Sequence, residues 1–335
     1  MTIRSFCLGA ALCLAACTKT VAAPGSDDAL TADTSADVAA AADTSLDASL
    51  DTAGDATTTS APTWRDSLKI CWTDLSCKRA FVISHGGDWS IGDFPYDSQG
   101  AFQRAADKGA DGIKTDVHVT KDNVAVVAHS SPIETWESTE CAGQLIEEMT
   151  ANEVTACKLF PSDTQTYQRL DTVLEWARGK VVIMLTVKES VDFPRAIQTV
   201  IEHNALDYVF LETGLGDLQN AVTKSADWQK SWYNASVSSE AELDTVINTV
   251  KSPRVAFLEI NVDYQKAQND KMADLLKNKI HPAGMRGFVS TISLPEIANH
   301  KALWDAGFDV IMTYNLDNAM AARTAVNTAR GVSPP

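Results

Sequence analysis

Short apolar runs that each end in a polar residue recur along the chain from residue 81 onward. The runs end at His85, Asp116, Thr186, Glu212, Asn234, Glu259, Thr291 and Thr313. Stretches with a helical spacing of apolar residues separate most of these runs, at residues 98–108, 171–178, 192–203, 239–250, 270–279 and 294–306. Strands that alternate with helices pair in parallel through right-handed crossovers, so this pattern of eight runs predicts a (β/α)8 barrel.

Polar residues at the strand ends are candidates for function, because the active sites of such barrels lie at the carboxyl ends of the strands. Those at or near the predicted ends are His85, Lys114, Asp116, His129, Thr186, Lys188, Glu212 and Glu259. Acids and bases occur together in this set, so the sequence predicts a site at that mouth of the barrel.

The stretch Gly109–His129 brings three of these groups together. Lys114 and Asp116 are two residues apart in an alternating, β-branched run, so both side chains leave the same face of a strand. A turn at residues 120–123 then leads into a short apolar strand that returns His129 beside the first strand. A carboxylate, an amine and an imidazole therefore converge in one pocket.

This stretch resembles the glycerophosphodiester phosphodiesterase family, which carries Gly-Ala-Asp, Glu-x-Asp-Val, Thr-x-Asp and Val-Val-x-His at the same spacing. The likeness extends to residues 82–87, where the family has His-Arg-Gly, and to residues 95–98, where it has Pro-Glu-Asn. Downstream it includes residues 184–188 and 307–313. The resemblance implies a TIM barrel of the phospholipase C-like phosphodiesterase type, with a short lid-like insertion after the second barrel strand.

Three acidic positions that hold a divalent cation in the family are changed in this chain. The replacements are Tyr96, Lys114 and Thr186. Only Asp116 keeps its place in the acidic pattern. Gly86 stands where the family has the Arg of His-Arg-Gly, and Ser130 stands where an Asp often follows the second histidine. Both histidines of the motif, His85 and His129, remain.

The resemblance implies a role for each remaining group. His85 and His129 would be the acid-base pair, and Asp116 would hold a lysine extended across the barrel mouth. The phosphate-binding groups would be Lys114, Lys188 and the backbone amides of Gly86 and Gly87. The catalytic set would be the two histidines together with Lys188 and Asp116.

Two arrangements stay open for the position of the family's cation. The change to Lys114 and Thr186 removes two negative charges and adds one positive, a shift of +3 that would roughly replace a divalent cation. In the other arrangement a calcium or magnesium site would be rebuilt from Asp97, Asp116, Glu212 and Glu259. No other cofactor is expected.

Two classes of function follow from these residues. The first is a phosphoric diester hydrolase that acts on glycerophosphodiesters or phospholipid headgroups. The second is a catalytically inactive barrel that binds a phosphorylated ligand or a protein partner at the cell surface. Retention of His85 and His129 favours the enzyme, because a binding module needs no paired acid and base, whereas loss of the acidic ligands favours the second class.

The N-terminal part of the chain has the composition of a leader and a tether. Residues 1–17 combine a basic start with a short apolar run, and their last four resemble a bacterial lipoprotein cleavage box, which implies that Cys17 is lipidated. A plain or uncleaved signal is the alternative. Residues 18–62 are an acidic Ala, Thr, Ser and Asp segment that cannot bury enough apolar surface to fold. We therefore expect an exported lipoprotein at the outer membrane or cell surface, with residues 63–335 as the barrel.

Net charge restricts the class of ligand, and the cysteines are candidates for disulfides. The net charge of −16 and the absence of a Lys/Arg-rich run argue against nucleic acid and favour a small phosphodiester or phospholipid headgroup. Export makes the cysteines of the barrel disulfide candidates rather than a zinc site. They are Cys71, Cys77, Cys141 and Cys157. Of the three connectivities, we expect neighbours to pair.

The remaining aromatic and histidine residues are expected to be structural. Trp89 and Trp136 are predicted to pack under loops, the alternative being a wall for a quaternary ammonium headgroup. The other histidines, expected at the surface or at helix caps, are His118, His203, His281 and His300. A capping box at residues 150–153 predicts a short helix in the insertion.

Overall fold

The computed structural model describes residues 71, 74–89, 94–223, 226–260, 270–291 and 297–332. The chain divides into two compact units, Met1–Thr57 and Thr58–Pro335, and every described residue belongs to the second. The predicted signal peptide, its Cys17 and the acidic tether all lie outside the described residues.

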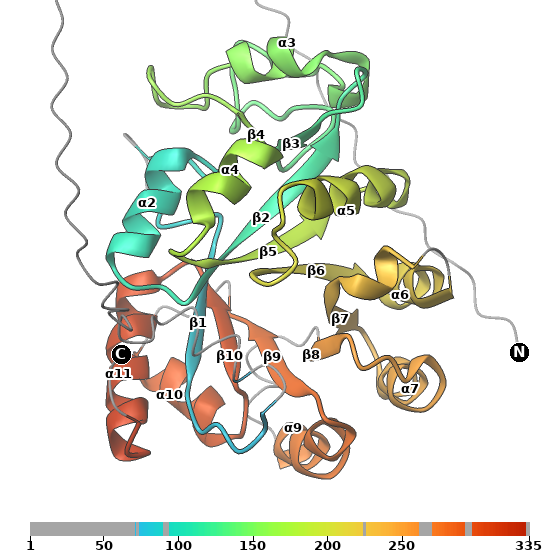
Figure 1. The fold of residues 1–335 in the computed structure, drawn as a ribbon. Helices are drawn as coiled ribbons and strands as arrows, with labels where there is room; N and C mark the ends of the chain where they lie inside the picture. The colour runs from blue at the N-terminus through green and yellow to red at the C-terminus, as the bar shows by residue number, and fades with distance from the viewer. Residues whose placement is uncertain are drawn as a thin grey trace, which may run out of the picture. The chain divides into compact units, whose positions relative to one another are not determined.

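Eight parallel strands of the described part close into a barrel (Figure 1). They are β1 (Phe81–His85), β2 (Gly112–Val119), β5 (Val182–Val187), β6 (Val209–Gly214), β7 (Trp232–Val237), β8 (Val255–Ile260), β9 (Arg286–Ser290) and β10 (Val310–Thr313). The sheet is closed because β1 pairs with β2 on one side and with β10 on the other. The predicted (β/α)8 barrel is confirmed.

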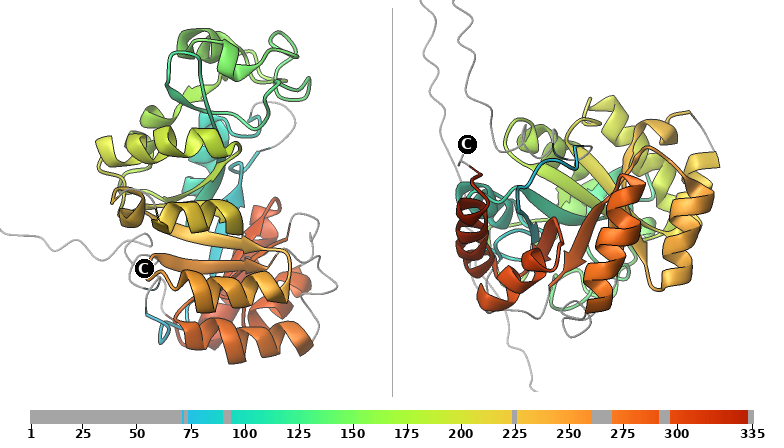
Figure 2. Two further views of the ribbon diagram at one scale, coloured as in Figure 1. Left: turned by 90° about the vertical axis from the view of Figure 1, so that its right-hand side faces the viewer. Right: turned by 90° about the horizontal axis from the view of Figure 1, so that it is seen from below.

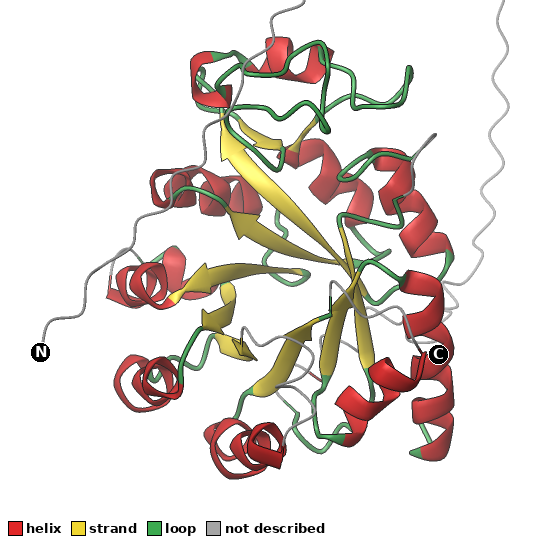
Figure 3. Ribbon diagram, turned by 180° about the vertical axis from the view of Figure 1, so that it is seen from behind, coloured by secondary structure: helices red, strands yellow, loops and turns green. Residues whose placement is uncertain are grey.

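Helices surround the strands on the outside of the barrel, as the view from behind shows (Figure 3). They are α2 (Gln99–Asp107), α4 (Leu170–Ala177), α5 (Phe193–Glu202), α6 (Leu215–Thr223), α7 (Glu240–Thr245), α9 (Asp270–Leu275), α10 (Ile297–Asp305) and α11 (Leu316–Ala329). Five short helical turns complete the ring, at Ser190–Asp192, Trp228–Lys230, Val246–Val250, Leu276–Ile280 and His281–Ala283. Within the described ranges, no helix is long and apolar enough to cross a membrane.

Two of these helices, α6 and α11, are not predicted by the apolar pattern. Helix α6 follows β6 without a loop, and Gly214 and Gly216 at its start read as a turn. Helix α11 buries two alanines and the polar residues Arg323 and Asn327 beside two larger apolar residues, so its hydrophobic stripe is weak. The two chain segments at the end of the barrel, α10 and α11, pack against each other (Figure 2).

Alternate residues of each strand face two separate apolar layers. On β5, Ile183 and Leu185 pack outward against the helices, whereas Val182 and Met184 face the barrel interior. Aromatic rings fill much of that interior, and those of Phe210 and Phe257 lie 4.7 Å apart. The interior is therefore a packed core rather than an open pore.

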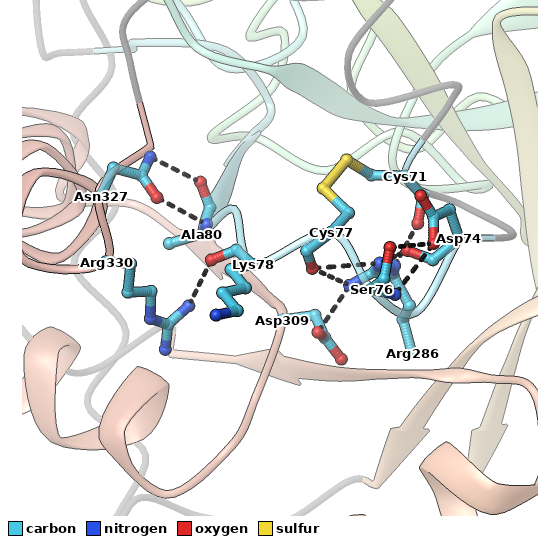
Figure 4. Close-up of a disulfide and its surroundings, with 10 residues drawn as sticks. All are labelled: Cys71, Asp74, Ser76, Cys77, Lys78, Ala80, Arg286, Asp309, Asn327 and Arg330. Carbon is cyan, nitrogen blue, oxygen red and sulfur yellow. Dashed lines mark hydrogen bonds and ion pairs between the residues drawn. A yellow bond between two sulfur atoms is a disulfide. The ribbon is translucent and has the colours of Figure 1, made fainter.

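The opposite end of the barrel is closed by the segment that precedes β1 (Figure 4). The disulfide between Cys71 and Cys77 holds this segment in a loop, and the buried guanidinium of Arg286 donates to the carbonyl oxygens of Cys71 and Asp74. Arg286 also forms an ion pair with Asp309 at 2.7 Å. This end is a structural floor.

An insertion between β2 and β5 confirms the predicted lid-like segment. The last residues of β2 pair with β3 (Ala125–Val127), which pairs in turn with β4 (Gln168–Arg169). The turn Ile146–Glu148 and helix α3 (Ala151–Ala156), opened by the predicted capping box, complete it. The insertion has its own apolar core and a second disulfide, Cys141–Cys157. Both predicted disulfide pairs are therefore confirmed.

Candidate active site

Asp116 lies at the centre of a charged cluster at the mouth of the barrel. Each of its carboxylate oxygens lies 2.6 Å from Nζ of Lys114, and Oδ1 lies 2.9 Å from Nζ of Lys188. The hydroxyl of Tyr96 donates a hydrogen bond to Oδ2 at 3.0 Å. Because Asp116 is fully buried, these groups replace the water that would otherwise solvate the carboxylate.

Strand register explains why the predicted site residues meet. Lys114 on β2 stands opposite His85 on β1. Strand β3 returns antiparallel to the end of β2, and the N–H of Ala128 donates to the carbonyl of Asp116 at 3.1 Å. Continued by one residue, this register brings His129 alongside Thr115, next to Lys114.

Both members of the central ion pair are charged at neutral pH. Burial raises the pKa of Asp116, but Lys114 and Lys188 outweigh burial and bring it to about 2. Burial lowers the pKa of Lys114, yet the nearby carboxylates, Asp116 above all, raise it above its usual value. Asp97 differs: burial and repulsion from Asp116 raise its pKa well above the usual range, and its Oδ2 accepts the backbone N–H of Asp116 at 3.2 Å.

The residues at this position do not fit a divalent cation. The ammonium group of Lys114 lies against Asp116, the one carboxylate of the family pattern that remains, and would repel a metal ion. Thr186 offers a hydroxyl in place of a carboxylate and donates it to Glu212. Within the described ranges, no group of three or more His, Cys, Asp and Glu side chains is placed to hold a metal ion.

The four carboxylates of the predicted rebuilt metal site do not assemble. Asp97 and Asp116 belong to the lysine cluster, whereas Glu212 and Glu259 interact with each other. Asn234 donates to Glu259 at 2.9 Å. Burial, followed by the charge of Glu212, raises the pKa of Glu259 well above its usual value. Glu259 is therefore engaged by Glu212 and Asn234.

His85 is buried beside the cluster. Its ring stacks on Tyr314, with centroids 4.5 Å apart and planes 4° from parallel. Burial, followed by the charge of Lys114, lowers the pKa of His85 to about 2. No polar atom of the described residues lies within hydrogen-bonding distance of its buried Nδ1. His85 is therefore a neutral imidazole at neutral pH.

His129 is the more accessible of the two histidines. Its Nδ1 lies 3.0 Å from the hydroxyl oxygen of Ser130. The buried carboxylate of Glu137 accepts the backbone N–H groups of His129 and Ser130 at 3.0 and 3.2 Å, which fixes the loop after β3. Burial lowers the pKa of His129, whereas Asp116 raises it.

Gly86 is not placed to bind phosphate through its amide, since its N–H donates to the carbonyl of Lys114 at 2.9 Å. This observation revises the predicted role. Its φ is +71°, and a Cβ at this position would lie 2.0 Å from Cε2 of Tyr96. Gly86 therefore makes room for the Tyr96 ring. At Gly87 a Cβ would lie 2.6 Å from the backbone of Ala101, so this residue allows helix α2 to approach.

An apolar cavity of about 560 Å³ opens directly beside the cluster. We call it the aromatic cavity, and it is lined by Trp89, Pro95, Tyr96, His129, Trp136, Phe160, Pro161 and Tyr314. The prediction that both tryptophans pack under loops is wrong, because Trp89 is 37% exposed and Trp136 is 42% exposed. Phe160 and Tyr314 are absent from the predicted site. Tyr314 directly follows the last barrel strand, so the rule that placed the other residues at strand ends also applies to it.

A second cavity, of about 310 Å³, lies on the other side of His129. We call it the polar cavity, and it is lined by His118, His129, Ser130, Ser131, Pro132, Ile133, Glu134, Lys188 and Glu189. His129 is shared by the two cavities. Lys188 reaches only the polar one.

The remaining histidines are divided between the surface and the core. His203 caps the end of α5 and His281 begins a helical turn, as predicted. His118 and His300 are buried, so the prediction of a surface or capping position is wrong for them. His118 lies 3.8 Å from Asp192, and Nε2 of His300 lies 3.3 Å from the hydroxyl of Thr313. Both are held by polar groups between the strands and the helices.

Residues 90–326 match the model of the Glycerophosphoryl diester phosphodiesterase family. One curated relative, the uncharacterized protein YqiK of Bacillus subtilis, is 29% identical over 143 residues. That match covers 39% of this chain and 57% of the relative, so the chain spans a little over half of its length.

Solved structures show the same fold. A glycerophosphoryl diester phosphodiesterase from Parabacteroides distasonis has a TM-score of 0.63 at 18% identity, over 79% of this chain and 93% of that one. A phosphodiesterase from Oleispira antarctica, solved in complex with the product sn-glycerol-3-phosphate, has a TM-score of 0.58 at 16% identity, over 73% and 96% of the two chains.

Proposed function

Because the chain belongs to the glycerophosphoryl diester phosphodiesterase family, we propose that it hydrolyses a glycerophosphodiester or a phospholipid headgroup without a metal ion. The observation that carries this proposal is the pair of ammonium groups, Lys114 and Lys188, on the single carboxylate of Asp116. They leave one net positive charge, which matches the single negative charge of a phosphodiester.

The two histidines have different roles in this proposal. His85, with a pKa of about 2, is neutral at neutral pH. It serves as the base that takes the proton from the hydroxyl group that attacks phosphorus. His129 is partly exposed at the junction of two cavities and donates a proton to the oxygen of the leaving alcohol. With a pKa of about 2, His85 carries no proton on its second ring nitrogen at neutral pH and cannot serve as the acid, which supports this order of roles.

The lysines act on the phosphate in place of the cation. Lys188 lines the polar cavity beside His129, where it can contact a phosphoryl oxygen directly. Lys114 is fully buried and is held by Asp116, so it contributes charge from beneath the phosphate. Both charges are in place before the substrate binds, so little reorganisation is needed in the transition state.

Export as a lipoprotein belongs to the same proposal. A lipidated Cys17 and the acidic tether would hold the barrel at the outer membrane or cell surface, within reach of phospholipid headgroups. A variant with Cys17 changed to Ser should lose radiolabelled palmitate and should fractionate away from membranes. Equal labelling of this variant and the parent chain would contradict the anchor.

The test of the catalytic proposal is turnover of glycerophosphocholine by His129→Ala. We expect the rate to fall by about 10²- to 10⁴-fold, the usual contribution of a positioned acid or base, while the melting temperature stays the same. His203→Ala, at the end of α5, is the matched control and should keep the full rate. An unchanged rate in His129→Ala removes that role.

The loss of the family's carboxylates at Tyr96, Lys114 and Thr186 favours a second candidate, a barrel that binds a phosphorylated ligand without turnover. Absence of turnover by the parent chain, beside an active family enzyme as a positive control, would support it.

A further inference from the structure

The aromatic cavity is walled by rings that stand at right angles to one another. Tyr96 is the central wall: its plane makes angles of 77° with Trp89, 72° with Trp136 and 74° with Tyr314. The centroids of these rings lie 5.9 to 6.4 Å from that of Tyr96. An indole N–H of Trp136 donates to Glu134, which fixes the orientation of that ring. The rings therefore pack edge to face around Tyr96, and all four line the aromatic cavity.

Exposed apolar side chains gather at this cavity. Five large apolar residues of the described part are exposed, and three of them, Trp89, Trp136 and Phe160, line it. The other two, Leu75 and Val191, lie elsewhere. Exposed aromatic side chains around a cavity lower stability unless a ligand or partner covers them. Such apolar patches are typical of binding sites.

The lining excludes several classes of ligand. Among the residues that the structure describes, no Asp, Glu, Lys or Arg side chain lines the aromatic cavity. A sugar or inositol ring would leave its hydroxyl groups without partners, and a primary ammonium would leave three N–H donors without acceptors. A trimethylammonium group has no N–H donor to satisfy, and its positive charge is attracted to the faces of aromatic rings.

Tyr96 joins this cavity to the charged cluster. Its ring forms a wall, while its hydroxyl lies 3.0 Å from Asp116 and 3.4 Å from Lys114. On the far side of His129 lies the polar cavity, with Lys188 and hydroxyl groups in its walls. A phosphate beside His129 thus has an aromatic space on one side and a polar space on the other.

We propose that the aromatic cavity binds the trimethylammonium group of a choline phosphodiester, while the polar cavity receives the glycerol hydroxyls. This assignment rests on the proposed function and gives it a substrate class. The choline ester belongs to a soluble glycerophosphodiester or to a lysolipid, and both present the same phosphocholine group.

The test is binding to the full chain of phosphocholine, phosphoethanolamine and 3,3-dimethylbutyl phosphate, measured by calorimetry. The last compound has the shape of phosphocholine with a neutral tert-butyl group. We expect phosphocholine to bind roughly ten-fold or more tightly than the other two, because only it has a cation without N–H donors. Equal binding of phosphocholine and the neutral compound, or no binding of phosphocholine, overturns the proposal.

One variant distinguishes the contribution of an aromatic ring to phosphocholine binding from that of apolar volume alone. Trp136→Leu keeps an apolar side chain and should weaken phosphocholine binding by roughly five- to thirty-fold, the effect of one ring on a desolvated cation. Trp176→Leu is the matched control, since Trp176 is half-buried on α4 outside the cavity, and it should bind as the parent chain does. Equal loss in both variants contradicts the assignment.

Turnover measured in parallel distinguishes this inference from the function it rests on. Hydrolysis of glycerophosphocholine and glycerophosphoethanolamine at equal rates, with no selective binding, overturns the choline assignment alone. Selective phosphocholine binding without any hydrolysis overturns the catalytic proposal alone. Glycerophosphocholine and lysophosphatidylcholine, compared as substrates, identify the soluble or the lipid source.

Discussion

Gly86 and Tyr96 share one volume: a Cβ on Gly86 would lie 2.0 Å from Cε2 of the Tyr96 ring. The family has Arg and Glu at these two positions, so the two replacements belong together. The missing side chain of Gly86 admits an aromatic ring where the family pattern has a carboxylate. The hydroxyl of Tyr96 donates a hydrogen bond to Asp116, and its ring lines the aromatic cavity.

Gly86→Ala should therefore displace Tyr96. We expect a loss of about 2–4 kcal/mol in the free energy of unfolding, from the strain of positive φ together with overpacking. Gly284→Ala is the matched control, because its φ is +83° and nothing lies within 4 Å of the added Cβ. Urea denaturation of both variants measures the difference. Equal losses would mean that the Tyr96 ring moves away without cost.

Lys114→Met should destabilise the protein and reduce turnover. Removal of one partner leaves the buried carboxylate of Asp116 with Lys188 as its only ammonium partner, at a cost of about 3 kcal/mol. The pKa of Asp116 should rise toward neutrality. Lys279→Met removes a lysine from the surface pairs with Glu240 and Asp244, and it should leave the unfolding midpoint nearly unchanged. A Lys114→Met variant as stable and as active as the parent chain would sink the proposed role of this ammonium group.

Turnover should persist in excess chelator. Lys114 stands where the family pattern has a carboxylate, and the described residues do not assemble a metal site. Rates measured with EDTA and with added calcium or magnesium should agree within about twofold, because charge stabilisation is already supplied by the lysines. Activity that disappears with EDTA and returns with calcium would show that a metal ion is required.

The rate should increase as the pH is lowered from 8 to 5. Catalysis needs His129 protonated, and its pKa is lowered below the usual 6.5, mainly by burial, so the reactive form increases as protons are added. His85 stays neutral throughout, because its pKa is about 2. The value of kcat/KM against pH should show one limb only, falling toward alkaline pH. A second limb with a pKa near 6 on the acid side would contradict the role of His85.

The free energy of unfolding should fall as the pH is lowered, whereas the rate should rise. The pKa of His85 is about 2 in the folded chain and near 6.5 when unfolded, so the unfolded state binds more protons between these values. The contribution to stability is complete above pH 6.5 and is lost as the pH falls. From pH 6.5 to 5 this one histidine should lower the unfolding free energy by about 2 kcal/mol. Urea unfolding of the parent chain and of His85→Asn tests this, because the variant should show a shallower dependence.

Local sequence patterns were sufficient to predict most of the strands and helices. Strand ends such as His85 and Asp116 could be placed because the period of apolar residues changes from two to about 3.6 at each strand and helix. The capping box at Thr150 and Glu153 could be placed because it depends only on residues three apart. Helix α11 could not, because its buried face mixes alanines with the polar residues Arg323 and Asn327 and so shows no continuous apolar stripe.

The sequence by itself determined the alternation of strands and helices and the presence of Lys114, Asp116 and His129 at one mouth of the barrel. Each depends on spacing along the chain. Only the tertiary structure decided that Tyr96 fills the space left at Gly86 and that rings from distant segments form one cavity. These contacts form because closure of the barrel brings separate loops together. The spacing of residues along the chain does not specify the distance between such loops.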